Sequence, residues 1–124
     1  MGLALSATGY HKTLSIGYGG FAGFRLCLAR AYSEKHGKMY EEMLRKMYVT
    51  DDFLKEWDKD CDKDLDILLW HSDCGGKLTP SECTRIKNSL LKLNIEDEDY
   101  KEFFNDFIEL LKHCSKRRVI VNFY

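Results

Sequence analysis

The sequence predicts an α+β fold that is mainly helical, with about five helices and a small sheet formed by the N-terminal and C-terminal strands. Three observations support this prediction: apolar residues alternate near the start, recur at helical spacing through the middle, and form a β-branched and aromatic run at the end. Of the 124 residues, 44% are hydrophobic and 13% are aromatic. Because this is enough for one hydrophobic core, we expect a single domain over residues 1–124.

The first predicted strand lies at residues 12–18, where large apolar side chains alternate with small or polar ones. A glycine-rich segment starts at Gly17, and residues 24–32 after it have a helical composition. We therefore predict a strand, a glycine turn and a helix, in that order.

Helical spacing of apolar residues predicts a second helix over residues 38–49 and a third over residues 50–70. Gly37 is expected to end the first helix. Thr50 is a typical N-cap, and the two aspartates that follow it suit the positive end of a helix dipole. The lysines and aspartates of the third helix sort into columns, which indicates a solvated face.

The clearest local signal in the chain is the start of the fourth helix. Thr79 supplies a hydroxyl cap, Pro80 suits the first helical position, and Glu82 lies three residues after the cap. This pattern predicts a helix over residues 80–93. The glycine pair before it, Gly75–Gly76, ends the third helix, so we expect the two helices to form a hairpin around which the other elements pack.

Residues 100–118 carry the most apolar helical stripe, and we expect this fifth helix at the centre of the core. Residues 119–124 are β-branched and aromatic, which predicts a strand. Two isolated strands are only marginally stable, so the first and last strands should pair with each other against the helices. Such a sheet would leave an apolar edge, and pairing across a two-fold axis would cover it, so we expect a homo-oligomer.

The composition argues against several classes of protein. With 19 basic and 20 acidic residues the net charge is −1, which does not suit a chain that coats nucleic acid. No stretch approaches the roughly 18 apolar residues of a membrane span, and the start lacks the pattern of a signal peptide. Five cysteines, an odd number, fit reduced thiols better than disulfides. We expect a cytoplasmic protein with no membrane partner and no cofactor.

The glycine turn is the preferred candidate site. Glycines between a strand and a helix leave backbone N–H groups free, and these groups can hold a phosphate or another anion with the help of the helix dipole. In the alternative interpretation the glycines only permit a tight turn and close packing. The expected ligand is small, anionic and nucleotide-like. Its predicted binding residues are Gly17, Tyr18, Gly19, Gly20, Phe21, Gly23 and Arg25.

Two metal sites are weaker candidates. Residues 71–82 resemble the calcium loop of the EF-hand, with Asp73 and Glu82 at ligand positions but His71 where that loop has an aspartate. Two carboxylates favour at most weak calcium binding, so we expect no metal requirement. The soft-metal alternative would use His71, Cys74 and Cys83 together with His113 or Cys114.

Three segments carry a resemblance to a known family: IGYGGF at Ile16–Phe21, LLWHSDCGGKLTPSEC at Leu68–Cys83, and the terminal VIVNFY. With them the chain resembles a family of small, uncharacterised proteins of Gram-positive bacteria and their phages. The resemblance covers most of the chain but implies no activity, so it assigns no functional residue. A phage setting implies an accessory or anti-defence role, in which the protein sequesters a nucleotide signal or binds a host defence protein.

We therefore expect a non-enzymatic binding protein that sequesters a small anionic ligand at the glycine turn. The runner-up is a protein-interaction module, or an inhibitor of a host enzyme, that uses the acidic helix face. A degenerate calcium module comes third. A small hydrolase comes last, because nothing in the sequence places a thiol beside an imidazole and an oxyanion hole.

Overall fold

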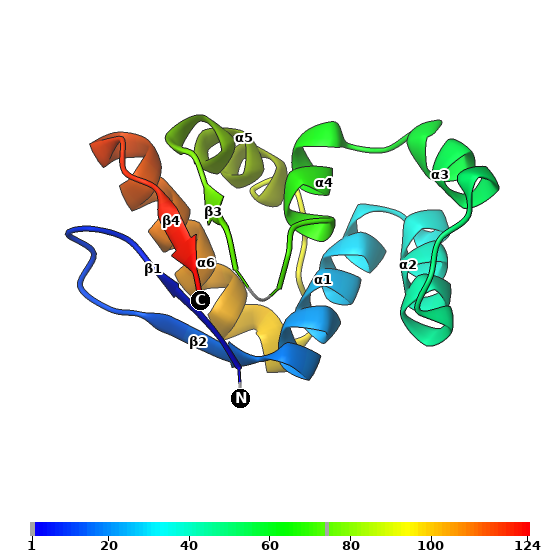
Figure 1. Cartoon of the computed structure of the whole chain (residues 1–124), viewed down its shortest axis with the longest axis horizontal. Coiled ribbons are helices and arrows are strands. Elements are labelled where there is room, and N and C mark those ends of the chain that lie inside the picture. Colours follow the sequence, from blue (N-terminus) through cyan, green and yellow to red (C-terminus); the bar gives the residue numbers. More distant parts are fainter. Residues whose placement is uncertain (1, 74) are drawn as a thin grey trace.

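The structure, a computed structural model, describes residues 2–73 and 75–124. These residues form six helices and a four-stranded antiparallel sheet, which confirms the predicted, mainly helical α+β fold (Figure 1). No helix within these ranges is long and apolar enough to cross a membrane. In chain order the elements are β1 (Gly2–Ser6), β2 (Leu14–Gly17), α1 (Tyr18–Tyr32), α2 (Glu34–Lys46), α3 (Asp51–Asp58), α4 (Lys63–Leu69), β3 (Lys77–Leu78), α5 (Pro80–Leu90), α6 (Glu98–Arg117) and β4 (Val121–Phe123).

The sheet has the strand order β2-β1-β4-β3, and each neighbouring pair is antiparallel. Leu5 of β1 lies beside Leu14 of β2 on one side and beside Phe123 of β4 on the other. The predicted direct pairing of residues 12–18 with the terminal strand is therefore wrong, because β1 lies between them. The sequence predicts no strand at β1, since only two large apolar residues, Leu3 and Leu5, alternate there.

The terminal strand β4 lies inside the sheet. It pairs with both β1 and β3, and its residues Val121 and Phe123 are buried. The edges of the sheet are β2, with four residues, and β3, with two. The apolar edge that motivated the expected homo-oligomer is thus covered within one chain, and self-association stays a prediction without that support.

The predicted glycine turn and the predicted helix end at Gly37 are both wrong. α1 begins at Tyr18 directly after β2, so most of the predicted glycine turn is helical, and Gly17 is the N-cap (φ −64°, ψ 157°). Ser33 caps α2 by accepting a hydrogen bond from the His36 N–H, and Gly37 lies inside that helix. A glycine inside a helix costs only about 1 kcal/mol, which the burial of neighbouring aromatic side chains outweighs here.

The predicted third helix over residues 50–70 is two helices, α3 and α4. Asp62 divides them: its carboxylate accepts hydrogen bonds from the N–H groups of Asp64 at 3.0 Å and Leu65 at 3.2 Å and so starts α4. An aspartate that bonds its own following backbone competes with helix continuation. The predicted cap of α3 by Thr50 is confirmed.

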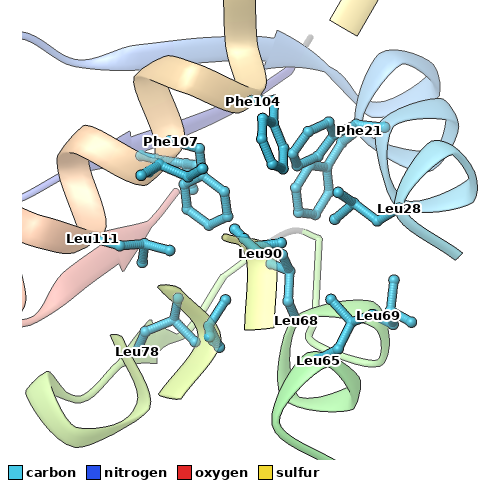
Figure 2. Packing of buried hydrophobic residues seen from close by; sticks show 14 of the residues in the cluster. Phe21, Leu28, Leu65, Leu68, Leu69, Leu78, Leu90, Phe104, Phe107 and Leu111 are labelled. Atoms are coloured by element: carbon cyan, nitrogen blue, oxygen red, sulfur yellow. The ribbon is translucent and has the colours of Figure 1, made fainter. Parts of the chain in front are cut away.

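The core lies among α1, α4, α5, α6 and the sheet, whereas α2 and α3 form the end of the molecule away from the sheet (Figure 1). The side chains of Phe107, Leu110 and Leu111 are fully buried, which confirms the expected central position of the last helix. Figure 2 labels core residues from five elements: Phe21 and Leu28 from α1, Leu65, Leu68 and Leu69 from α4, Leu78 from β3, Leu90 from α5, and Phe104, Phe107 and Leu111 from α6.

Thr79→Ala is expected to lower the free energy of unfolding by about 1 kcal/mol. The predicted capping box is present: the Glu82 N–H donates to Thr79 Oγ1 at 3.2 Å, and the Thr79 N–H donates to Glu82 Oε1 at 2.9 Å. The variant loses the first of these bonds. Urea denaturation measures the change, with Ser81→Ala as the control because Ser81 is an exposed hydroxyl in the same turn. Equal midpoints for the two variants would contradict the role of the cap.

Candidate functional site

The four glycines of the predicted site have different surroundings. Gly17 borders a shallow hollow beside β1, and Gly23 borders another between α1 and the start of α6. A side chain at Gly20 would touch Ile16, whereas a Cβ at Gly19 would have no heavy atom within 4 Å. Within the described residues, no side chain caps the first N–H groups of α1. This uncapped helix start is the feature that matches the expected anion site.

Arg25 is directed to the end of α4 rather than to the glycines. Its side chain is only 7% exposed, and Nη1 donates to the carbonyl oxygens of Leu69 at 2.9 Å and His71 at 2.6 Å. The guanidinium lies over the ring of Phe21, 4.2 Å from the centroid, and burial lowers its pKa. Phe21 is itself fully buried, and Tyr18 is half-buried. Two of the predicted ligand-binding residues, Phe21 and Arg25, are therefore part of the protein interior.

The weak metal candidates make contacts within their own loop. His71 Nδ1 lies 2.8 Å from the carbonyl oxygen of Ser72, and the Glu82 carboxylate accepts the Thr79 N–H. Asp73 is close enough to Arg25 to raise the pKa of that guanidinium, against the effect of burial. In the part of the chain that the structure describes, His71, Asp73 and Glu82 do not form a group with metal-ligand spacing.

The structure describes all but one of the residues of the soft-metal alternative. Cys74 lies outside the described residues. Cys83 and Cys114 are buried side by side between α5 and α6, where the Cys114 thiol raises the pKa of Cys83. The ring of His113 is directed to the loop between β1 and β2, with Nε2 3.0 Å from the carbonyl oxygen of Thr8.

Among the described residues, one group has metal-ligand spacing: the ligand atoms of Asp58, Cys61 and Asp66 lie within 4.8 Å of one another. The side chains of this group already form hydrogen bonds within the chain. The Asp66 carboxylate accepts the indole N–H of Trp57 at 3.0 and 3.1 Å. Burial and the Asp66 charge raise the pKa of the Cys61 thiol to about 11, so the thiol stays protonated at neutral pH. This cluster joins α3 to α4.

An apolar groove of about 490 Å³ lies between α2 and α3. Its apolar walls are Met39 and Met43 of α2, Tyr48 of the linker and Phe53 of α3, and we call it the α2–α3 groove. The two methionines are one helical turn apart and share a face of α2. The sequence shows them as an apolar stripe, which is also the pattern of a core helix. In the structure they are only partly buried, because α3 covers one side of α2.

The linker between α2 and α3 exposes large apolar side chains. Met47 is 82% exposed, Tyr48 62% and Val49 40%. Met47 is also in the left-handed region, with φ 64°, at the C-terminal end of α2, where glycine or asparagine is usual. A methionine there strains the backbone and gains no burial within the chain. Large apolar side chains gathered on one exposed surface mark a contact site.

An aromatic cluster behind the groove holds α3 against α2. The ring of Trp57 lies 4.4 Å from that of His36 and 6.1 Å from that of Phe53, centroid to centroid. His36 Nε2 lies 3.0 Å from the Trp57 carbonyl oxygen, in hydrogen-bond distance. Trp70 meets Trp57 edge to face at 5.2 Å. Phe53, which forms one wall of the groove, is part of this cluster.

Ion pairs occupy most of the charged rim of the groove. Lys46 pairs with Glu42 at 2.8 Å and lowers the pKa of that carboxyl, and Lys35 pairs with Glu56 at 3.0 Å. Asp52, in the first turn of α3, also lines the groove. It has no hydrogen bond or ion pair with any residue that the structure describes. The rim therefore presents an unpaired negative charge at the linker end.

Comparisons of this chain with models of protein families, with curated proteins and with solved structures found no match. The resemblance to small proteins of Gram-positive bacteria and their phages therefore stays a prediction. A function has to be inferred from the α2–α3 groove, the buried arginine and the glycine segment themselves.

Proposed function

We propose that the protein is a non-enzymatic protein-interaction module whose α2–α3 groove binds an amphipathic helix of a partner protein. The observation that supports this is the accessible apolar groove, which Tyr48 lines; the neighbouring linker residue Met47 is also exposed. A groove between two helices is a common receptor for a third helix, which inserts apolar side chains about one turn apart. Methionine walls adapt to such side chains because they are unbranched and flexible.

The polar groups of the groove favour a protein partner over a small polar ligand. Four of the five charged side chains that line it are already in ion pairs, so a small polar molecule would find few free partners. As far as the structure describes the lining, it includes no histidine, cysteine or serine, the residues that most often act as bases and nucleophiles. Binding without turnover fits this lining best.

A small anionic ligand at residues 17–23 is the second candidate, and the uncapped start of α1 favours it. Arg25 already donates to two carbonyl groups, so backbone N–H groups would hold the anion without a free guanidinium. This candidate therefore ranks below the groove. A phage accessory role, with a host defence protein as the partner, remains the prediction that the resemblance makes.

Site-specific photo-crosslinking tests the groove. Tyr48 and Tyr124 are similar aromatic residues, 62% and 60% exposed, on different parts of the molecule. We expect p-benzoylphenylalanine at position 48 to crosslink one discrete protein in bacterial cells, because position 48 would contact the bound helix. The same amino acid at position 124 is the matched control and should give no such product.

Equal crosslinking from both positions would show non-specific contact and contradict the proposal, as would the absence of any product from position 48. A nucleotide released from the purified wild-type protein on denaturation, and absent from Gly20→Asp, would instead move the anionic ligand to first place.

A further inference from the structure

The carboxylates at the linker end of the groove indicate the charge of the partner. Asp51 and Asp52 form the first turn of α3, and both are exposed. Neither has a hydrogen bond or ion pair within the described part of the chain, whereas the other charged side chains of the rim are paired. Asp52 lines the groove, whereas Asp51, Arg45 and Lys55 lie outside its lining. The free charge beside the apolar walls is therefore negative.

We infer, building on the proposed function, that the helix bound in the α2–α3 groove is basic. Its apolar stripe lies on Met39, Met43 and Tyr48. A lysine or arginine lies against Asp52 at the linker end, and the neighbouring Asp51 adds to the negative charge there. Opposite charges beside a desolvated apolar contact steer and orient the bound helix, and an acidic helix in the same place is repelled. The groove thus selects its partner by charge as well as by shape.

The same two carboxylates also stabilise α3 through the helix dipole, as first-turn carboxylates do in general. α6 has a corresponding pair, Glu98 and Asp99, in its first turn. That pair does not line the α2–α3 groove. The two pairs therefore share the effect on the helix dipole, but the first includes Asp52, which lines the groove, so the second pair is a matched control.

Fluorescence anisotropy with three labelled peptides tests the inference on the full chain. The first peptide is an amphipathic leucine–lysine helix, the second has glutamate in place of each lysine, and the third has the composition of the first without the apolar stripe. We expect the first to bind, and the other two to bind at least about tenfold more weakly. Tyr48→Ser should weaken binding of the first peptide about tenfold. The double variant Asp51→Asn/Asp52→Asn should weaken it about fivefold and reduce its dependence on salt.

The control double variant Glu98→Gln/Asp99→Asn should bind the first peptide as the wild type does. Equal weakening by both double variants would mean that only net charge matters and would overturn the inference. If the lysine and glutamate peptides bind with equal affinity and Tyr48→Ser abolishes the binding of both, the inference of a basic partner is overturned. The groove would then still bind helices, as the proposed function requires. Absence of binding by every peptide also overturns the inference. Concentration-dependent self-association that Tyr48→Ser abolishes would place a second copy in the groove and overturn it too.

Discussion

Arg25→Ala is expected to lower the free energy of unfolding by about 3 kcal/mol. The guanidinium Nη1 donates to the carbonyl oxygens of Leu69 and His71, at the end of α4, and the side chain is almost completely buried. Without it, the His71 carbonyl loses a donor, Leu69 keeps only the hydroxyl of Tyr40, and a cavity opens beside Phe21. Urea denaturation monitored by circular dichroism measures the loss.

Arg30→Ala is the control, because Arg30 is an exposed arginine on the same helix that forms a surface ion pair with Glu41. Surface pairs of this kind contribute at most about 1 kcal/mol. If Arg25→Ala and Arg30→Ala destabilise the protein equally, Arg25 does not hold α4, and its side chain is free for a ligand as the sequence first suggested.

The role of Arg25 could not be predicted from its neighbours in the sequence. An arginine after a run of glycines is typical of an anion site, and arginine is mostly an exposed residue. Its actual acceptors are carbonyl groups 44 and 46 residues later in the chain. Those acceptors exist only because α4 ends there, and α4 itself depends on the Asp62 cap that divides the predicted third helix.

Signals contained within a few residues were predictive. The capping box at Thr79, the cap at Thr50 and the apolar stripe of α6 depend on contacts within one turn or one face, and all three are confirmed. The terminal strand was also found, because its β-branched and aromatic residues are local. The position of this strand inside the sheet could not be predicted, since its neighbours β1 and β3 come from distant parts of the chain.

The α2–α3 groove was missed for a related reason. Met39 and Met43 form an apolar stripe on α2, and a stripe has the same spacing whether or not another helix covers it. What leaves the stripe accessible is the packing of the short α3, which contacts α2 through Trp57 and leaves Met39 and Met43 in the wall of the groove. The exposed Met47 and Tyr48 lie in a linker that the sequence pattern assigned to helices.

Gly37→Ala is expected to lower the free energy of unfolding by about 2 kcal/mol. α1 and α2 approach closely here: a Cβ on Gly37 would lie 2.9 Å from the Cα and 2.6 Å from the Cγ of Arg30. A backbone atom cannot turn aside as a flexible side chain can, so the two helices must separate. Overpacking of this kind costs about 3 kcal/mol, and the better helix propensity of alanine returns about 1 kcal/mol.

Gly19→Ala is the matched control, because Gly19 is also a helical glycine but has open space around it. With helix propensity as the main effect, it should raise the free energy of unfolding by about 0.5 kcal/mol. The two substitutions are chemically identical, so opposite signs in urea denaturation isolate the contact between the helices. If both variants are more stable than the wild type, α1 does not fix the position of α2. The methionine wall of the groove would then be free to move, and the groove would have to form on binding.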